Sequence, residues 1–123
     1  GLDFACKPAK DIPFIGRDAY LARKQQADGP YLCAIKLRDT GPLLHHNEPV
    51  LRDGKVVGYV TAGAYGYTVG SAVGLCFVSL AEGEADRKSL EQGRYSVMVE
   101  GQDIAADLSL TPFHDPQSKR MLA

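Results

Sequence analysis

The sequence predicts a mainly β fold with one N-terminal helix, and the strand pattern fits a Greek-key barrel or sandwich. Of the two, the prediction is a Greek-key-type six-stranded barrel. From residue 31 onward, about six short segments are strand-like, because they alternate apolar and polar residues or are continuously apolar. Glycine, proline and Asp-Gly turn signals separate these segments. Helical and strand-like segments do not alternate, which argues against a βαβ fold. The 123 residues suffice for one core but not for two.

Two parts of the chain differ in character. Residues 1–30 are interpreted as a lead-in with a connecting helix, and residues 31–123 as the barrel domain. The first residues contain no Met, no basic segment and no long apolar segment, so no signal peptide is visible. We therefore expect the sequence to be part of a longer protein.

The connecting helix is predicted over residues 19–26, where every residue is a good or tolerable helix former. Gly16 is the expected N-cap, and Asp18 lies in the first turn, where negative charge is favourable. Ile15 and Tyr20 have the spacing of a hydrophobic staple, in which an apolar residue before the cap packs on one in the first turn. A Gly-Pro pair at residues 29–30 ends the helix.

The first strands are predicted on both sides of a turn-rich segment. Residues 31–38 alternate with a period of two, which indicates a strand. A hairpin is predicted next, with strands at residues 50–52 and 55–60. Its turn is Asp53-Gly54, because both residue types tolerate positive φ.

Glycine is concentrated in the middle of the chain. Gly63, Gly66 and Gly70 are predicted to lie in a loop between two strands. Residues 72–78 are apolar enough for a buried strand, whereas residues 81–92 are polar and charged and are predicted to form a surface loop that has room for a short turn.

The last two strands are predicted at residues 95–99 and 104–110, with Gly101 in the turn between them. In each segment the apolar residues fall on one face of a strand. Residues 111–123 show no period and are expected to form an irregular tail.

Composition argues against several kinds of partner. The net charge is −1 and the pI is about 6.3, so nothing in the charge favours nucleic acid or an anionic membrane. No segment reaches the roughly 20 apolar residues of a membrane span. Cys6, Cys33 and Cys76 are far apart and form no CxxC motif, which favours a reducing compartment, the cytoplasm or a mitochondrial matrix. Cys33 and Cys76 lie in apolar runs and are expected to be buried reduced thiols.

Histidine and glycine clusters were considered as ligand sites. His45, His46 and Glu48 are close in sequence, but neighbouring residues on a strand point to opposite faces, so no metal site is expected. Residues 63–66 and 66–70 precede no predicted helix and lack a Gly-Lys-Ser/Thr ending, which argues against a phosphate loop.

No catalytic residue is predicted from the residue pattern. The sequence has no GxSxG elbow, and no Cys lies in a papain-like context. Tyr65 and Tyr67 are aromatic residues in a glycine-flanked segment. They could contact a ligand or a neighbouring domain, or they could be semi-exposed tyrosines at the rim of the barrel.

Three segments, in order, resemble one family. The first is residues 14–20 (FIGRDAY), and the second is residues 48–50 (EPV) followed by residues 54–63 (GKVVGYVTAG). The third is residues 112–116 (PFHDP) with Lys-Arg behind it. These segments resemble the C-terminal barrel domain of the glycine-cleavage T-proteins, or aminomethyltransferases, and the match spans about residues 12–120.

Some positions differ from the common family pattern. Ala62 stands where Ser is common, and Gly66-Tyr67 stands where stand-alone T-proteins have Ser-Pro. An aromatic segment here is similar to members that are fused to FAD-dependent dehydrogenases. The resemblance therefore points toward the folate module of dimethylglycine and sarcosine dehydrogenases.

The resemblance implies a function for the longer protein. In the family, a larger N-terminal domain binds tetrahydrofolate and supplies the key Asp for one-carbon transfer, and fused members also carry an FAD domain. The chain would then be a non-catalytic domain that packs against the folate-binding domain, and against an FAD domain where the protein carries one, and helps close the tetrahydrofolate cavity. The resemblance supplies no catalytic residue here, and Tyr65 and His114 are the positions expected to face the cofactor or the domain interface.

An alternative from another class is a stand-alone ligand-binding or interaction barrel without catalysis, because a fold does not determine a function. The two hypotheses differ in the surface they require. A domain of a larger enzyme should expose apolar residues where it packs, which could cause association in isolation. A stand-alone barrel should be a monomer with a polar surface.

Overall fold

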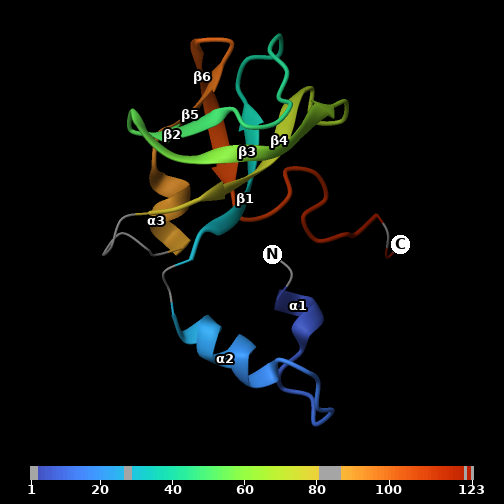
Figure 1. The fold of residues 1–123 in the computed structure, drawn as a ribbon. Coiled ribbons are helices and arrows are strands. Elements are labelled where there is room, and N and C mark those ends of the chain that lie inside the picture. Colours follow the sequence, from blue (N-terminus) through green and yellow to red (C-terminus); the bar gives the residue numbers. More distant parts are fainter. Residues whose placement is uncertain (1–2, 27–28, 81–86, 121, 123) are drawn as a thin grey trace.

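The computed structural model describes the chain except residues 1–2, 27–28, 81–86, 121 and 123 (Figure 1). Six antiparallel strands close into a barrel in the order β1-β4-β3-β2-β5-β6. Strands β2, β3 and β4 follow one another as neighbours, and β1 returns beside β4, which confirms the Greek-key prediction. The strands are β1 (Tyr31–Leu37), β2 (Pro49–Arg52), β3 (Lys55–Gly66), β4 (Ser71–Val78), β5 (Tyr95–Val99) and β6 (Gln102–Ser109).

The core fills the barrel with the inward-facing residues of all six strands. In β1 the alternation is as predicted, because Cys33, Ile35 and Leu37 are buried. Two further core residues come from outside the strands: Leu44 from the connection between β1 and β2, and Leu90 from a helix. These two leucines were not predicted as core residues, because neither segment has a strand period.

The predicted loop at Gly63 and Gly66 is wrong, because β3 continues through both residues to the turn before β4. Gly70, with φ of 74°, does lie in that turn. Glycine is needed at Gly63 for packing, since a Cβ there would overlap the backbone of Leu44. In a sequence, a glycine that allows two backbones to approach closely cannot be distinguished from a glycine in a loop, which is why the loop was predicted here.

The surface loop predicted over residues 81–92 is also wrong in its described part. Helix α3 (Arg87–Gln92) occupies the end of that segment and packs beside the barrel, whereas residues 81–86 lie outside the described residues (Figure 1). The fully buried Leu90 anchors it. Arg52 of β2 donates a hydrogen bond from Nη2 to the Ser89 carbonyl oxygen, 3.0 Å away, and so ties the helix to the β2–β3 hairpin.

An N-terminal arm, residues 3–26, lies below the barrel in Figure 1. It contains α1 (Asp3–Cys6) and α2 (Arg17–Gln25), and α2 corresponds to the predicted connecting helix. Gly16 is its N-cap as predicted, with φ of 86°. None of the helices in the described part of the chain is long and apolar enough to cross a membrane.

The predicted hydrophobic staple between Ile15 and Tyr20 is wrong, because Ile15 is fully exposed. The turn before α2 is held in another way. Arg17 donates hydrogen bonds from Nε and Nη2 to the Pro8 carbonyl oxygen, at 3.3 and 3.0 Å. This clamp leaves Ile15 pointing away from the helix that it was expected to cover.

Candidate functional site

An open groove of about 550 Å³ lies on the outside of the barrel, between the sheet formed by β1, β4 and β3 and the start of the C-terminal tail. Residues 110–114 of the tail form its wall. Its floor consists of outward-facing side chains, which alternate along the strands with the buried core residues. The floor residues are Leu32, Ala34, Ala62, Ala64, Val73 and Leu75.

The floor of the groove extends into a larger apolar surface. The strand register places Leu75 beside Ala34 and Ala62, and it places Phe77 beside Leu32 and Tyr59. We call these six residues the outer apolar face. Leu75 and Phe77 each keep 46% of their surface exposed.

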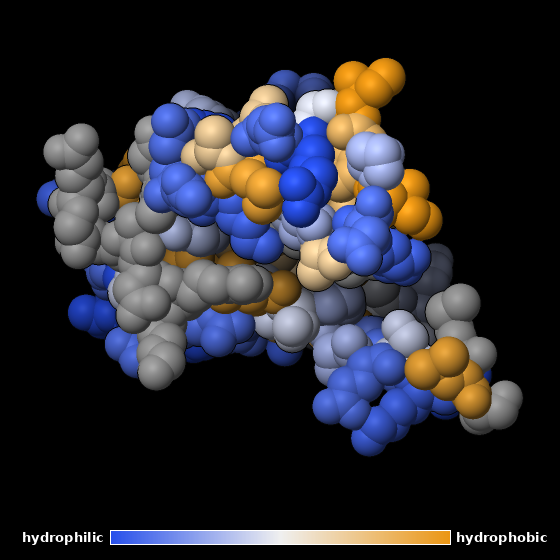
Figure 2. Space-filling view, turned by 90° about the horizontal axis from the view of Figure 1, so that it is seen from below, coloured by the Kyte–Doolittle hydropathy of each residue, from blue (hydrophilic) through white to orange (hydrophobic). Residues whose placement is uncertain are grey.

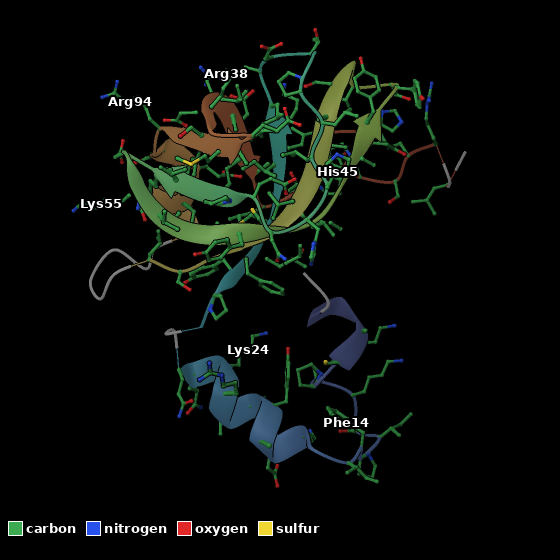
Figure 3. The ribbon with its side chains drawn as sticks, turned by 45° about the horizontal axis from the view of Figure 1, so that its top comes forward. Phe14, Lys24, Arg38, His45, Lys55 and Arg94 are labelled. Carbon is green, nitrogen blue, oxygen red and sulfur yellow. The ribbon has the colours of Figure 1, made fainter. Side chains whose placement is uncertain are left out.

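Viewed from below, the molecule carries hydrophobic residues on its surface at several places between hydrophilic ones (Figure 2). The N-terminal arm contributes its own: Ile12 and Ile15 are mostly or fully exposed, and Phe14 is partly exposed. Figure 3 shows Phe14 in the turn that precedes α2, apart from the barrel. The arm and the outer apolar face thus both expose apolar side chains.

Charged residues hold the tail at one edge of the groove. Lys36 of β1 lies 3.3 Å from Asp107 Oδ2, and its Nζ sits 5.4 Å from the centre of the Phe113 ring in the tail. Arg38 donates a hydrogen bond from Nε to Asp107 Oδ1 at 2.9 Å. Burial by itself would raise the pKa of Asp107, but the hydrogen bonds and charges of Arg38 and Lys36 lower it below the ordinary value.

A turn after the groove wall explains the Asp position of the third sequence motif. Asp115, with φ of 45°, accepts hydrogen bonds from the backbone N–H groups of Lys119 and Arg120, at 2.9 and 3.0 Å. The carboxylate thereby fixes the path of the tail beyond the groove. This role depends on the backbone of residues 119 and 120 and not on their side-chain charges.

The two predicted site residues lie in different environments. His114 is exposed and lines the groove, whereas Tyr65 does not line it. Tyr65 lies near the end of β3, where its ring makes an edge-to-face contact with Tyr67 at a centroid distance of 5.2 Å. Tyr67 is almost fully exposed, as expected of a tyrosine at the barrel rim. Of the two predicted site residues, His114 therefore lines the groove and Tyr65 does not.

The described residues supply little acid–base chemistry at the groove. Among the residues that line it, the ionisable side chains are His114 and the buried Cys33. Elsewhere, the His45 backbone N–H donates to Glu48 Oε1 at 2.8 Å, so Glu48 braces its own loop. In the described part of the chain, no three His, Cys, Asp or Glu residues are placed to hold a metal ion.

The apolar groove itself was not predicted. The sequence pattern identifies outward-facing residues on each strand, and Leu75 and Phe77 are visibly apolar where polar residues are expected. That irregular alternation was the available signal, but the continuously apolar β4 was interpreted as buried on both faces. The position of the tail along the sheet depends on tertiary contacts such as Lys36 with Phe113.

Comparisons with known proteins give one consistent result. Residues 31–115 match the family model described as the glycine cleavage T-protein C-terminal barrel domain. The chain is 34% identical to 4-methylaminobutanoate oxidase (formaldehyde-forming) of Paenarthrobacter nicotinovorans, over 98% of the chain and 14% of that protein. It is 30% identical to mitochondrial sarcosine dehydrogenase of Mus musculus, over 98% of the chain and 13% of that protein.

A solved structure shows the same fold. The crystal structure of glycine cleavage system aminomethyltransferase T from Bartonella henselae superposes with a TM-score of 0.66 at 20% identity, covering 84% of the chain and 27% of that protein. The chain thus spans less than a third of the length of each of these three proteins.

Proposed function

The chain belongs to the glycine cleavage T-protein C-terminal barrel family, and from this we propose that it is the docking domain of a folate-dependent aminomethyl-transfer protein. In this proposal the barrel packs against the domain that binds tetrahydrofolate and helps to exclude water from its cavity. The similarity to 4-methylaminobutanoate oxidase and sarcosine dehydrogenase supports a parent protein in which an FAD domain first oxidises an N-methylamine.

The observation that carries the proposal is the outer apolar face with its groove. Complete burial of a Leu or Phe side chain contributes about 1.5–3 kcal/mol. Because Leu75 and Phe77 are each about half exposed, covering them would add roughly 1 kcal/mol apiece. An interface centred on these two side chains and the groove would therefore be stabilised by residues that contribute little to the barrel alone.

The groove residues do not fit tetrahydrofolate as its main binding site. The cofactor carries a polar pterin and an anionic glutamate, which need hydrogen-bonding and cationic partners. The groove is lined mainly by aliphatic side chains, and in the described part of the chain neither Lys nor Arg lines it. The proposal therefore assigns cofactor binding and catalysis to the preceding domain, and it assigns packing to the barrel. His114 and Tyr65 stay candidates for contacts at the edge of the cavity.

The N-terminal arm supports the same arrangement. Ile12, Phe14 and Ile15 form a short apolar segment that the described structure leaves exposed. Arg17 holds this segment in a defined turn through its bonds to Pro8. A preceding domain that covers both this turn and the outer apolar face would bury two separate apolar surfaces and fix the barrel in orientation.

The experiment compares two surface substitutions in the longer protein that carries this sequence. Leu75→Lys places a charge in the outer apolar face, and Met98→Lys places the same charge on β5, outside the groove, where Met98 is 39% exposed. We expect Leu75→Lys to weaken tetrahydrofolate binding and turnover at least tenfold, and Met98→Lys to leave both unchanged. Equal effects of the two substitutions would contradict the docking role.

The two candidate contact residues need a separate test. We expect Tyr65→Ala and His114→Ala in the same longer protein to raise the dissociation constant for tetrahydrofolate. The expected stability of the barrel is unchanged for His114→Ala, because His114 is exposed. Wild-type affinity and turnover in either variant would remove that residue from the proposed cavity edge.

A further inference from the structure

Two thiols face each other inside the barrel, across the seam between β1 and β4. Cys33 and Cys76 are direct partners in the antiparallel register of these strands. Their exposed fractions are 1% and 0%, so both side chains point into the core. Neither is in a disulfide.

The register places the two thiols within reach of a disulfide bond. Directly opposed residues of an antiparallel pair have Cα atoms about 4.5–5.5 Å apart, within the roughly 4.4–6.8 Å that a disulfide spans. Cys76 Sγ already lies 3.7 Å from the Cys33 carbonyl oxygen. Closing the bond requires rotation of the side chains and an approach of at most about 1 Å between the Cβ atoms.

We propose that Cys33 and Cys76 are a protected dithiol that closes into an intramolecular disulfide, when the β1–β4 seam opens, by exchange with a low-molecular-weight disulfide. One cysteine thiolate attacks the disulfide, forms a mixed disulfide and releases one thiolate. The second cysteine thiolate then attacks the protein sulfur of the mixed disulfide and releases the other. The cysteines lose two electrons and two protons, and the small disulfide is reduced to two thiols.

The closed barrel protects this dithiol. Burial, together with the neighbouring Cys33, raises the pKa of Cys76 to about 12, so little thiolate is present at neutral pH. The thiols also have no solvent access in the closed form. Exchange therefore proceeds through transient opening of the β1–β4 seam, and its rate should follow the population of the opened form.

The disulfide would lie directly beneath the outer apolar face. Leu32 and Ala34 flank Cys33 on β1, and Leu75 and Phe77 flank Cys76 on β4, with their side chains on the opposite face of the sheet. Oxidation would fasten these two strands to each other at their centre. This inference rests on the barrel interior and does not require the proposed docking function.

The test uses the longer protein that carries this sequence, with the substitution Cys6→Ser. This substitution removes the third, half-buried thiol of residues 1–123. The protein is incubated with oxidised glutathione in a urea concentration below the unfolding transition, alkylated, digested and mapped by mass spectrometry. We expect a Cys33–Cys76 linked peptide as the main oxidised product, forming several times faster than without urea. Alkylated or separately glutathionylated Cys33 and Cys76 peptides without a linked product would overturn the proposal.

Two controls separate a native disulfide from one made by an unfolded chain. In Cys33→Ala and Cys76→Ala variants the remaining cysteine should accumulate as a glutathione mixed disulfide, because its partner is absent. The oxidised protein should unfold at a higher urea concentration than the reduced protein. A linked product that unfolds at a lower concentration would show that the native barrel does not accommodate the bond, which would also overturn the proposal.

Discussion

Substitution of Gly58 by Ala should strongly destabilise the barrel. Gly58 lies on β3 opposite Val50 of β2 and Val78 of β4. A Cβ at this position would overlap the carbonyl oxygen of Phe77 and would lie 2.9 Å from its carbonyl carbon. Both obstacles are backbone atoms of the neighbouring strand, so the clash can be relieved only by moving β4 away from β3.

The size of the effect follows from the kind of atoms that must move. Overpacking of a core by small groups costs about 1–3 kcal/mol, and a clash with backbone belongs at the upper end, about 3 kcal/mol. For a domain of this size that corresponds to a fall in Tm of about 12 °C. The barrel should stay folded, because domains are typically stable by about 5–15 kcal/mol.

Gly66→Ala is the matched control, because Gly66 is also on β3 and receives the same substitution. The nearest atom to its added Cβ is a methyl group of Val73, at 3.1 Å, which can turn aside. We expect a change within about 1 kcal/mol. Urea unfolding of the 123-residue chain, followed by tyrosine fluorescence because the chain lacks Trp, measures both variants. Equal losses in the two variants would refute the close-approach explanation.

Three further predictions concern ionisable groups and the outer apolar face. Tyr95 has a buried hydroxyl without a hydrogen-bond partner in the described structure, so Tyr95→Phe should leave the free energy of unfolding unchanged or raise it by up to about 1 kcal/mol. Burial raises the pKa of Tyr95 to about 12 from 10.0, so the unfolded chain loses the phenol proton first and the free energy of unfolding falls as the pH rises from 10.0 through about 12. Phe cannot titrate, so alkaline unfolding of Tyr95→Phe should occur at higher pH than that of the wild type. Because the pKa of Asp107 is lowered, its carboxylate stabilises the fold above the ordinary carboxyl pKa, and this stabilisation is lost as the pH falls through the lowered value. The free energies of unfolding of wild type and Asp107→Asn should therefore converge as the pH falls below about 4. Because Asp107 is more than a third exposed, the difference at pH 7 should not exceed about 1 kcal/mol in urea unfolding. Finally, the isolated chain should self-associate at high concentration in analytical ultracentrifugation, and the Leu75→Lys chain should be a monomer. The same association state for both chains would count against self-association through the outer apolar face.

The strands were predictable where one local rule determined them. The period of two placed Cys33, Ile35 and Leu37 in the core, and Asp53-Gly54 marked the β2–β3 turn, with φ of 51° and 80° at these two residues. The number of strand-like segments and their turn signals predicted a Greek-key type of barrel, but the order of the strands around it was not predicted. Local period alone does not determine which strands pair across the barrel.

Elements fixed by tertiary contacts were not predictable in the same way. Helix α3 is polar except for Leu90, and one apolar residue carries no periodicity, so its burial could not be read from the segment. Gly63 signals a loop in sequence, and only the proximity of Leu44 shows that it serves packing. Predicting the groove required knowing where the tail lies and which side chains of β4 face outward. Both are determined by contacts between residues far apart in the chain.

The central claim, that the outer apolar face is covered by the rest of a longer protein, is tested most directly by hydroxyl-radical footprinting. Side-chain oxidation would be compared between the 123-residue chain, at a concentration where it is a monomer, and the longer protein. Leu75 and Phe77 should be oxidised several times more slowly in the longer protein, whereas Met98 on β5 should be oxidised at the same rate in both. Equal oxidation of Leu75 and Phe77 in the two proteins would show that this face stays open to solvent and is not a docking surface.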